Sequence, residues 1–395
     1  MLRLVYTPQM SGAPAGYGDA EDTLAQRNGA GEETVLQHFH KAGPEFVAAN
    51  QALHAAIDVW LAGRADQGAP VIVLVHGFQY DPDDPRVKGA SPFDILYGLP
   101  SASNPAAMSW LPLVGECDET GGALAECAIA FAYKSEGSPA ETNAAGWSNS
   151  YQLAVFDLAP LAARVLASIL DDLGQRPGLT IRLLAHSLGT RTTSRAVGIL
   201  RDGRAARIDR AVLLDGAEFS ADAAVHFASC GFDVFNIVNR RDQVLNKGAD
   251  EMCHPFRQAQ QGEACVIGRD GLGGNPRWCD LRVDDPAVAQ WFARGNTPDG
   301  VAYPIEPLAR AGDPHGVANL QHWGCYTNPA NRPLLRALLA RDAMTVAGFQ
   351  AQGVPALSGC PMAGTFGGVT PSEIPDDAAG RRAMDAAPRH DGGLH

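Results

Sequence analysis

One serine stands out because of the small residues on either side of it. Ser187 lies in the segment AHSLG, with Ala185 two residues before it and Gly189 two residues after it. A tight turn from a strand into a helix has little room at these two positions, because neighbouring backbone comes close. Such a turn exposes the serine hydroxyl and aims the N–H of Leu188 at an oxygen that gains negative charge. The spacing therefore predicts that Ser187 is a nucleophile.

A nucleophilic serine needs a carboxylate that orients its general base, and two aspartates follow Ser187 at the ends of predicted strands. Asp215 ends the strand AVLLD, and Asp242 follows the strand VFNIVN. Chain order permits either to be the acid. An aspartate at such a position can also be a simple helix cap.

Two histidines near the end of the chain are candidates for the general base. His322 lies in the segment LQHWGCY, and His315 lies seven residues earlier in DPHG. We favour His322, because Trp323 and Tyr326 can anchor its loop against the body of the protein. His315 lies among Pro and Gly, with less to hold it, and is the alternative base.

The elements that must position these residues alternate between strands and helices. Such alternation implies right-handed crossovers and a mostly parallel sheet. A loop is expected at 9–34, an irregular excursion over the site at 79–126, a second irregular segment at 135–150, and a helix kink or break at Pro160. The expected strands are 1–10, 71–75, 128–133, 179–185, 208–214, 233–239 and 278–283, and the expected helices are 45–61, 151–173, 188–200, 222–229 and 332–349.

The apolar strand ending in HGF at 76–78, the AHSLG turn, and the later Asp and His resemble the α/β-hydrolase superfamily. The similarity is greatest to bacterial serine esterases and lipase-like members, and covers about 70–345. It implies an α/β-hydrolase fold, a Ser-His-Asp triad, an oxyanion hole and no cofactor. It also places the acid at Asp242 and the base just before the terminal helix, where His322 lies.

The HGF segment has a mechanistic interpretation within this resemblance. The backbone N–H of Phe78 is expected to be the second oxyanion donor beside Leu188, and His76 is expected to shape the loop through hydrogen bonds. Aromatic residues in the irregular segments are candidates for an apolar wall around the acyl group of a substrate. They are Trp110, Tyr133 and Trp147.

Composition limits the possible partners. The 395 residues carry a formal net charge of −13, which disfavours a nucleic-acid partner. We find no apolar run of about 20 residues that would cross a membrane, and no established metal-ligand spacing. The eight cysteines are scattered, which favours reduced thiols in the cytoplasm, with a Cys117–Cys127 disulfide as the exported alternative. We expect one domain over 1–358 and a mobile tail from 359 to 395.

The predicted activity is hydrolysis of a carboxylic ester in a small acyl substrate. Cleavage of a thioester or an amide by the same triad is an alternative, since sequence does not separate these reactions. A binding protein that keeps the fold without catalysis is a further alternative, because fold alone does not establish function. An aspartate-nucleophile dehalogenase is disfavoured because Ser187 occupies the turn.

Overall fold

The computed structural model describes most of the chain in thirteen segments. Four of the predictions concern residues outside these segments, namely His315, Trp147, Cys117 and the tail from 359. The described segments are 1–8, 21–28, 32–40, 49–82, 91–98, 109–114, 127–137, 139–145, 149–200, 207–228, 230–247, 266–306 and 322–357.

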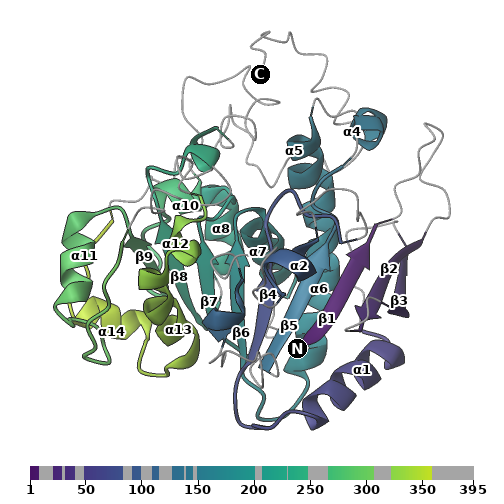
Figure 1. The fold of residues 1–395 in the computed structure, drawn as a ribbon, viewed down its shortest axis with the longest axis horizontal. Helices are drawn as coiled ribbons and strands as arrows, with labels where there is room; N and C mark the ends of the chain where they lie inside the picture. Colours follow the sequence, from purple (N-terminus) through teal and green to yellow (C-terminus); the bar gives the residue numbers. More distant parts are fainter. Residues whose placement is uncertain are drawn as a thin grey trace.

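A nine-stranded sheet forms the centre of the described structure (Figure 1). Its order is β3-β2-β1-β5-β4-β6-β7-β8-β9. Only β2 runs antiparallel to its neighbours, and all other pairs are parallel, so the predicted mostly parallel sheet is confirmed. The strands are β1 (Leu2–Thr7), β2 (Glu21–Arg27), β3 (Glu33–His40), β4 (Val71–Val75), β5 (Ala128–Tyr133), β6 (Ile181–His186), β7 (Ile208–Leu214), β8 (Asp233–Val238) and β9 (Trp278–Arg282).

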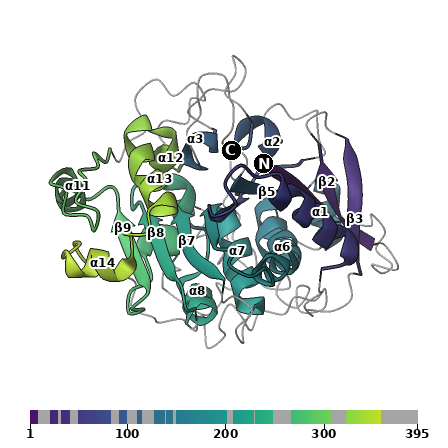
Figure 2. The same cartoon turned by 90° about the horizontal axis from the view of Figure 1, so that it is seen from below.

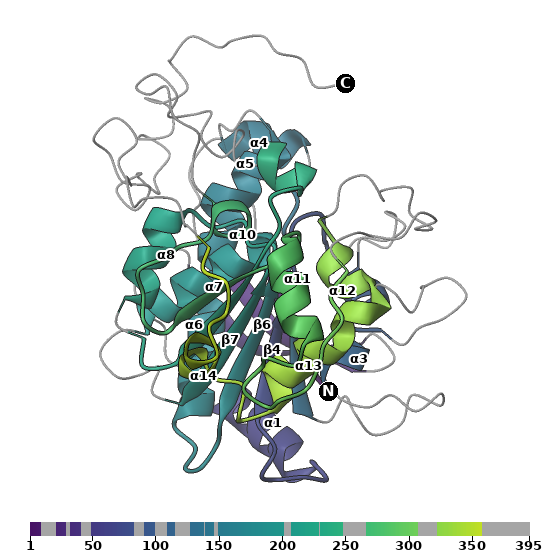
Figure 3. The ribbon, with the colours of Figure 1, turned by 90° about the vertical axis from the view of Figure 1, so that its left-hand side faces the viewer.

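Helices cover both faces of this sheet (Figures 2 and 3). The apolar run at 71–75 explains this cover, because alternate side chains of a strand point to opposite faces of the sheet and both faces here are apolar. Val73 joins a core with α1 (Gln51–Ala62), α6 (Ala159–Gly174), α7 (Leu188–Ile199) and α8 (Ser220–Phe227). Leu74 joins the opposite core with α3 (Leu111–Val114), α11 (Pro286–Ala293), α13 (Arg332–Ala340) and α14 (Val346–Ala351). Both faces are therefore buried, as the continuous apolar strand predicts. Short helices α2 (Pro92–Ile95), α4 (Pro139–Ala145), α5 (Ser150–Leu153), α10 (Ile267–Asp270) and α12 (Gly324–Thr327) complete this set.

Four expectations about local structure are wrong. The irregular excursion expected at 79–126 contains α2 and α3, whose Phe93, Leu113 and Val114 lie in the buried core beside Leu74. The loop expected at 9–34 contains β2 and the start of β3, whose edge pairing uses mostly polar residues and buries few large apolar ones, chiefly Leu24 and Leu36. The irregular segment at 135–150 contains α4. The helix expected at 332–349 is divided into α13 and α14, because Arg341 has extended backbone and Thr345 caps the second helix through the N–H of Gly348.

The expected break near Pro160 is a π turn. Residues 154–158, labelled η2 (Ala154–Leu158), form this turn between α5 and α6. A π turn accommodates the missing N–H of proline without ending the helix. The continuous span Ser150–Gly174 is long and apolar enough to cross a membrane, so the expectation that the chain has no such run is wrong. In this fold 78% of its most apolar window is buried, and core packing accounts for its composition.

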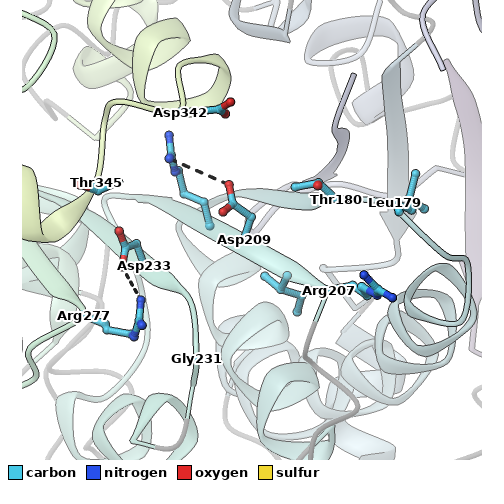
Figure 4. A pocket seen from close by; sticks show the side chains of 12 residues that line it. Leu179, Thr180, Arg207, Asp209, Gly231, Asp233, Arg277, Asp342 and Thr345 are labelled. Carbon is cyan, nitrogen blue, oxygen red and sulfur yellow. Dashed lines mark hydrogen bonds and ion pairs between the residues drawn. The ribbon is translucent and has the colours of Figure 1, made fainter. Parts of the chain in front are cut away.

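Two buried arginines at the amino end of the sheet hold the last turn of α13. Arg182 on β6 donates to the carbonyl of Leu339 (2.7 Å), and Arg210 on β7 donates to that of Leu338 (2.6 Å). Cations stabilise the unpaired carbonyls at a helix C-terminus. A cavity of about 460 Å³ opens at this edge (Figure 4), and its Arg277 pairs with Asp233 (3.1 Å). These contacts give the edge a structural role, at the opposite end of the strands from Ser187.

Candidate active site

The direction of the chain connections reverses between β4 and β6. After β4 the chain turns back to β5, whereas after β6 it continues to β7 on the other side. In parallel sheets, ligands bind where neighbouring connections leave in opposite directions, at the carboxyl ends of the strands. Val75 pairs with Ala185 in the register of these strands, so the HGF and AHSLG segments emerge side by side. The two motifs predicted to act together therefore meet at this point.

Strained backbone is concentrated at the same edge. Three described residues other than glycine have positive φ: Gln79 (69°), Ser187 (53°) and Asp215 (45°). They follow β4, β6 and β7 in turn. Such conformations cost about 1–3 kcal/mol each and cluster at functional sites, where the surrounding structure holds them. Here the carbonyl of Leu214 accepts the N–H of Ser187 (2.9 Å), which fixes the turn to the neighbouring strand.

Glycine is required at position 189 for steric reasons. A Cβ there would lie 2.4 Å from the carbonyl oxygens of both His76 and Val75. The loop after β4 crosses directly over the first turn of α7, and only a hydrogen fits between them. The steric argument for the residue after the serine turn is thus confirmed.

Ser187, His322 and Asp242 form a continuous hydrogen-bonded chain. His322 Nε2 lies 2.8 Å from Ser187 Oγ, and His322 Nδ1 lies 2.6 Å from Asp242 Oδ2. All three are buried, with exposed fractions of 5%, 3% and 0%. Since an ionised carboxylate only accepts, Nδ1 carries the proton, and Nε2 is left to accept from the serine hydroxyl. The three residues favoured from sequence are brought together from segments 80 and 135 residues apart.

Asp242 and Asp215 occupy different environments. Asp242 accepts the N–H of Leu245 (2.9 Å) with its second oxygen, which fixes the carboxylate beside His322. Asp215 is fully buried, and no described residue makes a hydrogen bond to either of its carboxyl oxygens; the Cys325 thiol is nearby without reaching that geometry. Burial, and then the charge of Asp242, raise the pKa of Asp215 well above its usual value. This shift favours the protonated carboxyl, which gives an imidazolium no counter-charge.

His76 orients the peptide that carries the predicted oxyanion donor. Its Nε2 accepts the N–H of Tyr133 (3.0 Å), so Nδ1 holds the proton and donates to the carbonyl of Gly77 (2.9 Å). In a planar trans peptide the N–H points opposite to the carbonyl. Holding the Gly77 carbonyl therefore turns the N–H of Phe78 away from His76. Burial lowers the pKa of His76 to about 3, so its ring is neutral, which agrees with the expected role in shaping the loop.

The second predicted donor belongs to a helix terminus. Leu188 is the first residue of α7, and the first N–H groups of a helix have no acceptor within it. With Ser187 as the residue before the helix, this N–H lies directly beside the nucleophile in the chain. The assignment of Phe78 and Leu188 as oxyanion donors stays a prediction.

The aromatic wall predicted from sequence is corrected. Tyr133 is fully buried and stacks on His76, with ring centroids 4.5 Å apart. Trp110 is fully buried against Tyr326 at 5.7 Å. These rings support the site from the core and offer a substrate no open face.

A different apolar cluster borders the predicted donors. Phe78 and Tyr151 are partly buried and contact each other edge to face, with centroids 5.0 Å apart. They pack on a group that includes Leu188 and Phe219. Sequence reasoning missed Tyr151 and Phe219 because neither lies in a motif. For Tyr151 alone the sequence carried a signal, namely its place as an aromatic residue at the start of the most apolar helix.

A buried ion cluster holds α7 behind the nucleophile. Arg191 lies four residues after Ser187, is fully buried, and contacts Glu218 (2.5 Å) and Asp222 (3.2 Å). It also donates to the carbonyl of Val155 in the π turn (2.9 Å). This side chain therefore ties the nucleophile's helix to η2 and to the loop after β7. No sequence pattern pointed to it.

Nothing in the described residues groups three side chains suited to hold a metal ion. The described cysteines, at 127, 230, 279 and 325, are unbridged. No protein-family model matches the sequence, and comparison with curated proteins finds no match. The chain has an α/β fold with a mostly parallel sheet.

Proposed function

We propose that this protein is a serine hydrolase of the α/β-hydrolase type that cleaves carboxylic esters through an acyl-enzyme. The observation that carries the proposal is the buried hydrogen-bonded chain from Ser187 through His322 to Asp242. It stands at the carboxyl ends of β4 and β6, where the connections reverse direction, on a strained serine turn. Chain order and placement agree with the resemblance of the HGF and AHSLG segments.

In the first half of the reaction, Ser187 Oγ attacks the ester carbonyl carbon while His322 Nε2 takes the hydroxyl proton. The carbonyl oxygen becomes an oxyanion that receives the N–H groups of Phe78 and Leu188. Asp242 stabilises the imidazolium and keeps its ring in the required orientation. The tetrahedral intermediate collapses, the C–O bond to the alcohol breaks, and His322 gives its proton to the leaving oxygen.

In the second half, water attacks the acyl-enzyme. His322 Nε2 removes a proton from the water, and the same two N–H groups hold the second oxyanion. Collapse releases the carboxylic acid, and the proton returns to Ser187 Oγ. Each group is used twice, so the chain needs no cofactor for this chemistry.

The border of Phe78, Tyr151 and their apolar neighbours favours an acyl group that is itself apolar. Both oxyanion residues send their side chains into this cluster. A substrate whose carbonyl oxygen sits between the two N–H groups would therefore extend along aromatic and aliphatic surface. Burial of such surface contributes about 25 cal/mol per Å².

The test is reaction with a fluorophosphonate followed by intact-mass measurement, together with hydrolysis of p-nitrophenyl acetate. Wild type should gain one adduct and hydrolyse the ester. Ser187→Ala should take no adduct and lose roughly 10⁴-fold or more in turnover, with an unchanged thermal melt. Ser194→Ala is a matched control, because Ser194 is buried in the same helix and bonds His226 instead of the triad (2.9 Å). Folded wild type that neither labels nor hydrolyses the ester would overturn the proposal and favour a binding protein.

A further inference from the structure

His186, the residue before the nucleophile, makes a contact that the mechanism does not use. Its ring is buried among Trp110 and Tyr326. Its Nε2 lies 3.1 Å from the main-chain carbonyl oxygen of His322. The two imidazole rings lie with centroids 4.7 Å apart. The end of β6 therefore leads directly into the nucleophile and also contacts the backbone of the base, His322.

This contact has a defined chemical sense. A carbonyl oxygen only accepts, so His186 Nε2 must carry the proton and donate. Nδ1 is then a bare acceptor, and no described residue donates to it. Burial, and then the nearby His322, lower the pKa of His186 well below its usual value, which keeps the ring neutral. A neutral ring also spares the imidazolium at His322 a second positive charge.

We propose that His186 is a positioning residue that sets where His322 stands relative to Ser187. The inference rests on the proposed function and deepens it. Asp242 holds the imidazole through Nδ1, but that bond leaves the ring free to swing about the line joining the two groups. Fixing the carbonyl of His322 defines the backbone from which the ring projects.

The described backbone around His322 shows why this anchor matters. On its C-terminal side the chain closes into α12, where Thr327 N–H bonds the carbonyl of Trp323 (2.9 Å). That turn shapes the segment after the base, and Tyr326 within it packs into the core that covers the sheet. The bond from His186 joins His322 directly to the end of β6. A displacement of about 1 Å in a reacting group can cost on the order of 10²-fold in rate.

The simpler interpretation is that His186 only fills the core. One pair of variants, with a replacement for one of them, separates the two interpretations. His186→Gln places an amide N–H near the position of Nε2, whereas His186→Leu fills similar volume without a donor. If the leucine variant does not fold, His186→Asn replaces it: its amide corresponds to Nδ1 and is too short to reach the carbonyl, while its polarity matches that of Gln.

The experiment measures kcat and KM for p-nitrophenyl acetate, with kcat normalised to the sites titrated by fluorophosphonate. His186→Leu (or Asn) should lower kcat per active site by about 10–100-fold with KM within about threefold, and His186→Gln should recover most of it. The downfield NMR signal of the His322 Nδ1 proton should be broadest in His186→Leu (or Asn) and sharper in His186→Gln. A merely structural role would reduce the folded fraction and leave kcat per titrated site unchanged, which would overturn the inference. Unreactive wild type would instead count against the proposed function.

Discussion

The two buried aspartates at the carboxyl ends of β7 and β8 offer a sharp test. Substitution by the isosteric asparagine should greatly reduce kcat at one of them and leave kcat almost unchanged at the other. Asp242 uses one oxygen for His322 Nδ1 (2.6 Å) and the other for the N–H of Leu245 (2.9 Å). An asparagine has only one acceptor oxygen. In Asp242→Asn, the oxygen that keeps Leu245 turns the NH₂ group towards His322. The imidazole then has to accept at Nδ1 and carry its proton on Nε2, where it cannot take one from Ser187.

The expected loss in kcat for Asp242→Asn is therefore on the order of 10⁴-fold, the effect of holding a catalytic histidine in the wrong tautomer. Asp215 should behave differently. Its pKa is raised by burial and by Asp242, which favours the neutral carboxyl, and asparagine has nearly the same shape. Asp215→Asn should change kcat by less than about threefold, which is below 1 kcal/mol in the barrier.

Both variants can be compared through the rate constant for fluorophosphonate labelling and the hydrolysis of p-nitrophenyl acetate, with thermal melts as the folding control. Equal losses in the two variants would contradict the assignment of Asp242 as the only acid. A fully active Asp242→Asn beside an inactive Asp215→Asn would reverse it. Either result would also show that the neutral state assigned to Asp215 is wrong.

Two further predictions concern stability. Gly189→Ala should lower the free energy of unfolding by about 2–4 kcal/mol and slow fluorophosphonate labelling, because its Cβ would lie 2.4 Å from two backbone oxygens. Gly231→Ala is the control in urea unfolding, because a Cβ there meets nothing within 4 Å. Equal effects of the two substitutions would contradict the steric argument. Because the pKa of His186 is lowered in the folded protein, the unfolded chain binds a proton below about pH 6.5 that the folded protein does not bind. This group should therefore lower the free energy of unfolding on acidification by up to about 1.4 kcal/mol per pH unit. His186→Gln should lower that slope between pH 6.5 and 5.5, and an unchanged slope would refute the argument.

Sequence reasoning found the centre of the protein because its constraints are local there. The buried runs of β4 and β6 are recognisable from continuous apolar residues, and the serine turn from the small residues at 185 and 189. The choice of His322 came from its aromatic neighbours, of which Tyr326 is fully buried. Such features depend on neighbours within a few residues and are visible without a structure.

What was missed depends on contacts between distant segments or on weak patterns. The β2–β3 hairpin lies at the sheet edge and buries few large apolar side chains, so its alternation is weak. Trp110 and Tyr133 lie beneath the site because of how the sheet is covered, which no spacing encodes. The contact from His186 to the carbonyl of His322 spans 136 residues, and backbone acceptors leave no mark in a sequence.

Arg182 and Arg210 tie the middle of the chain to α13 across 157 and 128 residues. Proteins are made from the N-terminus at about 5–20 residues per second, so roughly 7–27 s pass between the synthesis of Ser187 and that of His322, 135 residues later. During this interval a growing chain holds the nucleophile without its imidazole, and the sheet face beside α3 and α11 still lacks α13. Newly made chains should thus be inert towards fluorophosphonates until the last helices dock, and reactivity would report completion of the fold.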